Sequence, residues 1–110
     1  MNKWKRGEVW LVDLGMVAKI RPCLVLSISP NENDRRVATL IPHTTSVRGS
    51  SFEVPLAVRF LKAGAFTVQG IVSVTPSSLI RRLGVLSPSQ LKAVEAAVGL
   101  WLGFPQGDDD

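Results

Sequence analysis

The segment that decides the fold spans residues 9–41 and reads VWLVDLGMVAKIRPCLVLSISPNENDRRVATLI. It contains three short runs rich in valine, isoleucine and leucine, at residues 9–14, 22–28 and 37–41. Such runs, separated by polar segments with glycine, proline and asparagine, are typical of β-strands joined by turns. No helical crossover of the kind that parallel strands require separates them. The segment therefore predicts antiparallel pairing.

Two further runs continue this pattern, FEVPL at residues 52–56 and TVQGIVSV at residues 67–74. Five short strands without helical crossovers favour a small antiparallel β-barrel, and thus a mainly β fold. Residues 75–78 (TPSS) resemble a short helix start, so we expect a helical turn that continues to Arg82 and ends at Gly84.

The last third of the chain changes to a helical period. Ser87 suits the N-cap, Pro88 the first helical position, and Gln90 the position that completes a capping box. Apolar residues then recur at helical spacing at Leu91, Val94, Val98 and Trp101. We expect this amphipathic C-terminal helix to cover the barrel or a subunit interface.

Length and composition limit the classes of site. A chain of 110 residues and 11.9 kDa fits one domain, which we assign to residues 1–104, followed by an acidic tail at residues 105–110 for which we expect disorder. The single cysteine, Cys23, excludes an internal disulfide, and its apolar run predicts a core position. The single histidine, His43, excludes paired-histidine zinc motifs. We therefore expect neither a metal nor a cofactor.

Charge suggests a polyanionic partner. Thirteen lysines and arginines face nine acidic residues, and without the three terminal aspartates the balance rises from +4 to +7. This excess favours nucleic acid or an acidic protein as partner, although a generic soluble basic protein is the equally simple interpretation. The basic N-terminal residues precede no apolar segment of the signal-peptide kind, and the longest uncharged stretch, residues 63–80, is too polar to span a membrane. We expect a cytoplasmic protein.

Four segments, in order, resemble the MazF/PemK toxins of bacterial toxin–antitoxin systems. They are RGEVWLVDL at residues 6–14, RPCLVLS at 21–27, IPHTTS at 41–46 followed by FEV at 52–54, and LGVLS at 83–87 before the final helix. The resemblance implies a small SH3-like β-barrel with a C-terminal helix, usually dimeric. It also implies a toxin that cleaves single-stranded RNA at short sequences without a metal ion and that a cognate antitoxin inhibits.

By the same resemblance, the family's catalytic arginine falls on Arg21 and its catalytic threonine on Thr44. Metal-free RNA cleavage drives the ribose 2′-OH onto the adjacent phosphate, so the site needs cationic donors for the developing charge. Arg21 suits phosphate clamping, because its planar fork binds two oxygens, whereas its high pKa makes it a poor base. Thr44 is assigned to positioning the phosphate or the 2′-OH. The structural alternatives are a strand-end arginine packed on Pro22 and a threonine that satisfies its own turn.

Weaker RNA-binding candidates surround this pair. They are Lys19, Thr45, Ser46, Arg48, Arg81 and Arg82, with Arg35 and Arg36 on a nearby polar loop. Contacts of this kind are made mostly to phosphates and carry no sequence choice, and each charge alone is equally consistent with a solvated surface. His43 neighbours Thr44 in sequence, but strand neighbours point to opposite faces, so we expect a packing or rim role for it. Core packing is likewise the expected role of Trp10, Phe52 and Phe66.

Two departures from the family pattern motivate an alternative function. The first loop, residues 15–20, is short and lacks an acidic residue, and residues 69–72 (QGIV) replace an acidic residue and an arginine that members commonly carry there. The alternative is a non-catalytic binding module of the same fold that acts on a protein target, as a gyrase poison does.

Overall fold

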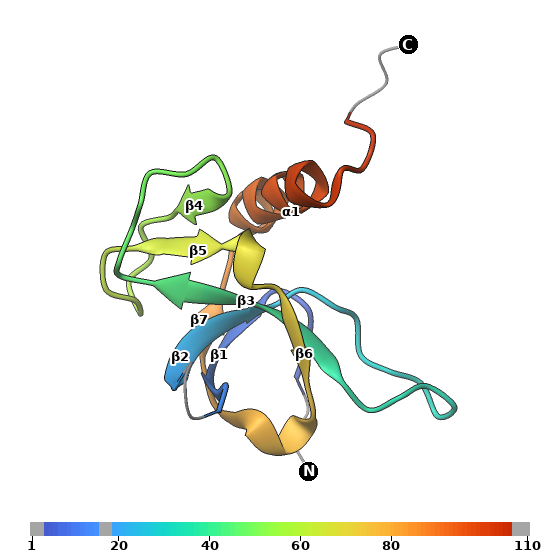
Figure 1. The fold of residues 1–110 in the computed structure, drawn as a ribbon. Coiled ribbons are helices and arrows are strands. Elements are labelled where there is room, and N and C mark those ends of the chain that lie inside the picture. Colours follow the sequence, from blue (N-terminus) through green and yellow to red (C-terminus); the bar gives the residue numbers. More distant parts are fainter. Residues whose placement is uncertain (1–3, 16–18, 107–110) are drawn as a thin grey trace.

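The computed structural model describes residues 4–15 and 19–106. Antiparallel strands and one C-terminal α-helix form this part of the chain (Figure 1). In chain order the elements are β1 (Glu8–Asp13), β2 (Ile20–Val25), β3 (Ala38–Thr44), β4 (Glu53–Pro55), β5 (Ala65–Thr67), the 3-10 turn η1 (Val68–Gly70), β6 (Val72–Val74), the 3-10 turn η2 (Pro76–Ser78), β7 (Leu79–Val85) and α1 (Pro88–Leu102).

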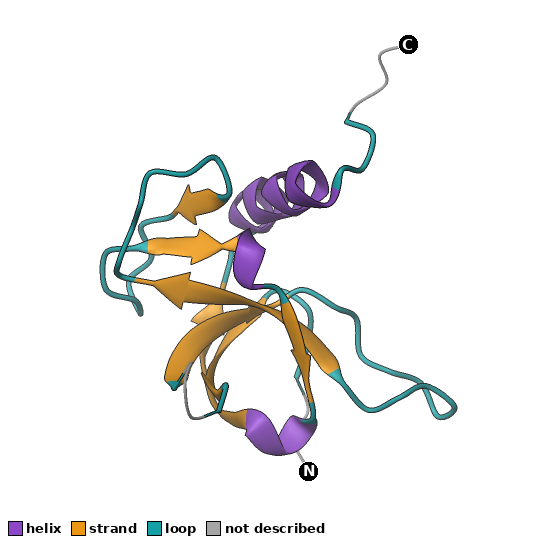
Figure 2. Cartoon of the chain, viewed as in Figure 1, coloured by secondary structure: helices purple, strands orange, loops and turns teal. Residues whose placement is uncertain are grey.

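The strands form one sheet in the order β4-β5-β3-β2-β1-β7, with β6 paired to β3 off this path. All the pairings are antiparallel, which confirms the sequence-based expectation. The sheet curls on itself in the manner of a small barrel (Figure 2), although its strand path runs from β4 to β7 without hydrogen-bonded closure in the part of the chain described.

Strand β3 organises the sheet because it holds three neighbours. Its first half pairs with β6, its end pairs with β5, and its middle pairs with β2 through Leu24 and Ile41. Between the β6 and β5 segments lies Pro42, which has no N–H to offer to a ladder. The chain crosses this gap in the turn η1, where an ideal Cβ on Gly70 would lie 3.2 Å from Pro42 Cγ. The single strand predicted over residues 67–74 is therefore wrong.

The helical turn predicted from residue 75 to Arg82 is also wrong beyond its start. Only η2 is helical, and the chain then forms β7, which pairs with β1. Leu79 is buried in the core, so tertiary packing overrides the local signal. Gly84 does not end a helix. It allows close packing, because a Cβ there would lie 2.4 Å from Phe60 Cε2.

The C-terminal helix begins as its sequence predicts. Ser87 Oγ accepts the Gln90 N–H at 3.2 Å, Gln90 Oε1 accepts the Ser87 N–H at 2.8 Å, and Gly103 ends the helix at φ 76°. Val94 and Val98 are buried against the sheet. Trp101 is 41% exposed and contacts the Phe52 ring at a centroid distance of 4.9 Å.

Two apolar clusters stabilise the fold. Side chains alternate along the first three strands, so neighbouring residues enter different clusters. Val9, Leu24 and Ile41 pack beneath α1, whereas Trp10 and Cys23 pack in the second cluster with Leu79. Burial on both faces explains why these strands are continuous apolar runs. The Cys23 thiol is buried as predicted, and burial raises its pKa to about 12.

Candidate active site

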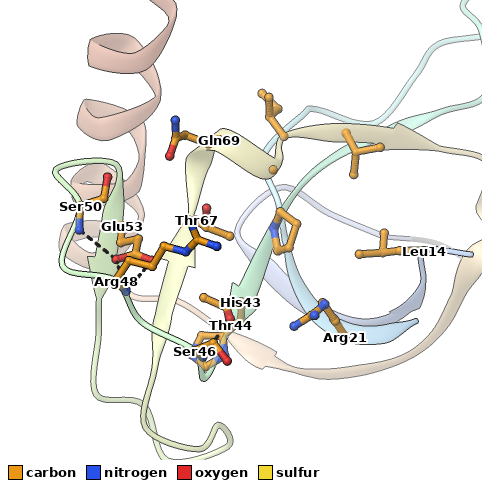
Figure 3. A pocket seen from close by; sticks show the side chains of 14 residues that line it. Leu14, Arg21, His43, Thr44, Ser46, Arg48, Ser50, Glu53, Thr67 and Gln69 are labelled. Atoms are coloured by element: carbon orange, nitrogen blue, oxygen red, sulfur yellow. Dashed lines mark hydrogen bonds between the residues drawn. The ribbon is translucent and has the colours of Figure 1, made fainter. Parts of the chain in front are cut away.

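A pocket of about 660 Å³ opens beside the C-terminal half of β3 (Figure 3). Charged, polar and apolar side chains from β2 to β6, the turn η1 and the loops around them line it together. The lining residues are Leu14, Arg21, Pro42, His43, Thr44, Ser46, Arg48, Ser50, Glu53, Thr67, Gln69, Gly70, Ile71 and Val72. Residues far apart in the sequence therefore meet in one cavity.

Arg21 enters the pocket from β2. It is the second residue of that strand and pairs with Val12 of β1, so its backbone is held within the sheet. Its side chain is partly exposed and points toward the centre of the pocket (Figure 3). A guanidinium on a paired strand is well placed to receive an anionic group, because its planar donors bind two oxygens at once.

Thr44 ends β3 and faces the same pocket. Its Oγ1 accepts the backbone N–H of Ser46 at 3.0 Å, which is the local turn contact foreseen as the structural alternative. A hydroxyl accepts and donates at once, so this contact leaves the Thr44 O–H available as a donor. The turn contact and a role in binding are therefore compatible.

The loop after Thr44 brings Ser46 and Arg48 to the pocket. The carboxylate of Glu53 accepts the backbone N–H groups of Arg48 at 3.0 Å, Gly49 at 2.8 Å and Ser50 at 3.0 Å. Although burial raises the pKa of Glu53, these hydrogen bonds and the nearby Arg48 charge outweigh it and hold the pKa below its ordinary value. Glu53 is therefore ionised near neutral pH.

His43 also lines the pocket, contrary to the expectation that it and Thr44 serve separate surfaces. Its side chain is 3% exposed, its ring meets Phe66 edge-on at 5.1 Å, and its buried Nε2 has no hydrogen-bond partner among the described residues. Burial lowers the pKa of His43, so the imidazole is neutral at pH 7. These contacts agree with the packing role expected from the sequence.

The structure gathers only part of the predicted set. Arg21, Thr44, Ser46 and Arg48 line the pocket, whereas Lys19, Thr45, Arg81 and Arg82 do not. Arg82 instead pairs with Glu8 at 3.1 Å, and that buried carboxylate also accepts Trp10 Nε1–H at 2.9 Å. Burial raises the pKa of Glu8, but these contacts and the Lys5 N–H lower it overall.

Among the described residues, four polar residues of the pocket are absent from the sequence-based set: Ser50, Glu53, Thr67 and Gln69. Glu53 lay within the FEV segment, but no spacing rule connects it to residues 48–50. Thr67 and Gln69 come from β5 and η1 and reach the pocket because the chain turns in η1, next to Pro42 of β3. Pairing across β3, which only the folded chain reveals, brings them there.

Within residues 4–15 and 19–106, no group of three or more His, Cys, Asp or Glu residues is arranged to hold a metal ion. No helix in the same ranges has the length and apolar character of a membrane span. Residues 16–18 of the short first loop, and residues 107–110 of the predicted acidic tail, lie outside the described residues.

Comparison with known proteins gives concordant matches. Residues 5–102 match the family model described as PemK-like, MazF-like toxin of type II toxin–antitoxin system. The chain is 31% identical over 96 residues to the protein named Probable endoribonuclease MazF5 of Mycobacterium tuberculosis, covering 84% of this chain and 87% of that protein.

Solved structures show the same fold. A mycobacterial endoribonuclease in complex with its cognate antitoxin superposes with a TM-score of 0.82 at 22% identity, covering 96% of this chain and 100% of that chain. The Mycobacterium tuberculosis toxin MazF-mt6 gives a TM-score of 0.76 at 28% identity, covering 90% of this chain and 99% of that chain.

Proposed function

The chain belongs to the PemK-like, MazF-like toxin family of type II toxin–antitoxin systems, and from this premise we propose that it is an endoribonuclease that cleaves single-stranded RNA without a metal ion. The observation that carries the proposal is the meeting of Arg21 and Thr44 in one pocket. The two residues come from different strands, and both were assigned to catalysis from sequence resemblance alone.

The proposed reaction is an internal transfer at phosphorus. The ribose 2′-oxygen bonds to the adjacent phosphorus, and the bond from phosphorus to the 5′-oxygen breaks. The 2′-OH loses its proton in this step, and the leaving 5′-oxygen gains a proton. The products are a 2′,3′-cyclic phosphate and a 5′-OH end. Negative charge grows on the phosphoryl oxygens during this step, so preorganised donors accelerate it.

Arg21 and Thr44 supply such donors. We assign Arg21 to clamping the scissile phosphate and stabilising its developing charge. Thr44 donates its hydroxyl to a phosphoryl oxygen or orients the 2′-OH, while the Ser46 N–H fixes the position of its oxygen. Ser46 and Arg48 line the same pocket and bind the neighbouring RNA backbone. Lys19, Thr45, Arg81 and Arg82 remain predicted phosphate contacts outside the pocket.

The partners follow from family membership and charge. We propose that the protein acts in the cytoplasm as a homodimer and that an acidic, partly disordered antitoxin competes with RNA for the basic pocket. The chain carries +4 overall, and in the described part of the chain two arginines line the pocket against one carboxylate, Glu53, whose oxygens accept backbone N–H groups.

The test is incubation of the purified protein with a long RNA of mixed sequence in EDTA, followed by mapping of the cut sites and their ends. Discrete cuts at a short sequence with 5′-OH ends are expected, and a folded Arg21→Ala variant should make none. Equal cleavage by that variant overturns the role of Arg21. The absence of cleavage by the wild type favours the alternative of a binding module with a protein target.

A further inference from the structure

The carboxylate of Glu53 occupies a nest of three successive backbone N–H groups. Its Oε1 accepts from Arg48 at 3.0 Å, Gly49 at 2.8 Å and Ser50 at 3.0 Å, and its Oε2 accepts a second contact from Arg48 at 3.1 Å. Gly49 has φ 78°, a left-handed conformation that glycine adopts without strain. Concave N–H nests of this kind bind anions, and here the chain supplies its own.

This nest, rather than burial, holds the loop. Residues 45–49 are all exposed, so packing contributes little to their position. The end of the loop is anchored: Ser50 Oγ accepts the Phe52 N–H at 3.0 Å, and the Phe52 ring rests on Trp101 of α1. The exposed segment between Thr44 and this anchor is therefore held mainly by the Glu53 carboxylate.

The loop position decides where Arg48 lies. Figure 3 shows Arg48 and Arg21 entering the pocket from opposite sides, with Thr44 between them. Two guanidinium groups that line one pocket can each bind a phosphate of the same strand. Holding the Arg48 backbone in place reduces the conformational entropy that binding costs.

We propose that Glu53 is a positioning residue for RNA, and that by filling the nest at residues 48–50 it holds Arg48 as a second phosphate clamp opposite Arg21. This inference rests on the proposed function, since it names how the same pocket binds its substrate. This role also explains why a pocket for a polyanion contains a carboxylate. The oxygens of Glu53 point at backbone N–H donors, whose dipoles offset the negative charge.

For the variant Glu53→Ala, the positioning role and simple electrostatics predict opposite changes in RNA affinity. Glu53→Ala removes a negative charge from the pocket, so charge alone predicts tighter RNA binding. If Glu53 positions Arg48, the same variant binds RNA about tenfold more weakly, as expected when one charge-assisted contact is lost. Glu53→Gln keeps one carbonyl oxygen for the nest and should lose less. Glu32→Ala, which removes an exposed carboxylate outside the pocket, is the charge control and should not weaken binding.

The experiment measures binding of a short RNA with 2′-O-methyl groups, which block the proposed cleavage, by fluorescence anisotropy over a series of salt concentrations. The plot of log affinity against log salt has a negative slope. Arg48→Ala and Glu53→Ala should each make this slope shallower by about 0.7, the value for one phosphate contact on a single strand. The double variant should bind no more weakly than Arg48→Ala, because Glu53 acts through Arg48.

Several results overturn the inference. They are unchanged or tighter binding by Glu53→Ala, or losses in the two single variants that multiply in the double variant. Thermal unfolding of each variant separates a loss of contact from a loss of fold, and Glu53→Gln carries the test if Glu53→Ala unfolds. Because the probe is not cleaved, failure of the proposed nuclease activity appears separately, as an absence of cuts in natural RNA by a protein that binds the probe.

Discussion

The hydroxyl of Thr44 and the backbone N–H of Ser46 are joined by a hydrogen bond of 3.0 Å at the end of β3. This contact orients the Thr44 side chain before any substrate arrives. It uses an acceptor lone pair of the oxygen and leaves the proton to be donated into the pocket. Preorganised donors of this kind lower barriers because they need no rearrangement during the reaction.

Replacing Thr44 by valine should abolish most of the activity with little change in stability. The shape of the side chain is kept, but the donor is lost, and loss of one such donor lowers kcat by about 100-fold or more. Ser46 is an exposed residue, so its N–H can bond to water instead, and the free energy of unfolding should fall by less than about 1 kcal/mol. Thr44→Ser keeps the hydroxyl and should retain activity. Equal kcat for Thr44→Val and the wild type would exclude Thr44 from the reaction.

Gly64 is predicted to be essential to the geometry of the site. An ideal Cβ at this position would lie 2.2 Å from the Thr44 carbonyl oxygen and 2.7 Å from His43 Cε1. Gly64→Ala must therefore displace β3, with a loss of stability of about 1–3 kcal/mol and a loss of cleavage. Urea unfolding and a cleavage assay check both effects.

A matched glycine provides the control for Gly64. Gly99 lies within α1, and a Cβ there would meet only the end of the flexible Gln106 side chain, at 3.0 Å. Alanine is favoured over glycine in helix interiors by about 1 kcal/mol, so Gly99→Ala should be neutral or stabilising. If both variants behave alike, the close approach of Gly64 to Thr44 has no special role.

His43 should make the protein less stable as the pH falls below about 6.5. Burial lowers its pKa in the folded protein, whereas the unfolded chain protonates it below about 6.5. The unfolded state then binds more protons, so the free energy of unfolding falls as the pH decreases from about 6.5 toward the lowered pKa. His43 is the only histidine of the sequence, so His43→Phe should flatten this dependence in urea titrations. If His43→Phe leaves the pH dependence of stability unchanged, His43 is not its source. Loss of RNA cleavage by this variant would indicate a chemical role for His43.

Glu8 is predicted to stabilise the fold through its hydrogen bonds more than through its ion pair. Glu8→Ala leaves the Trp10 indole N–H without its partner in the core, at a cost of about 1–3 kcal/mol. Arg82→Ala removes an exposed partner, whose loss costs about 1 kcal/mol or less. Equal losses in chemical denaturation would contradict this order, and weaker RNA binding by Arg82→Ala would support its predicted RNA contact.

Much of the fold could be predicted from the sequence, because most local sequence signals agree with the tertiary structure. The antiparallel strands come from apolar runs whose alternate residues enter two clusters, as Trp10 and Val9 do. The helix follows from the Ser87 cap and its apolar spacing. The predictions of one strand over residues 67–74 and of a helix through Arg82 were wrong, because partners remote in sequence set the local structure. These partners are Pro42 for the first segment and β1 for the second.

The sequence by itself determined which segments form the first strands and the C-terminal helix. Its resemblance to a known family assigned Arg21 and Thr44 to catalysis. Only the tertiary structure decided that Arg48 and Glu53 share a pocket with them and that Arg82 does not. The physical reason is that spacing rules act over a few residues, whereas the pocket is built by strand pairing across β3 and by one carboxylate folding an exposed loop around itself.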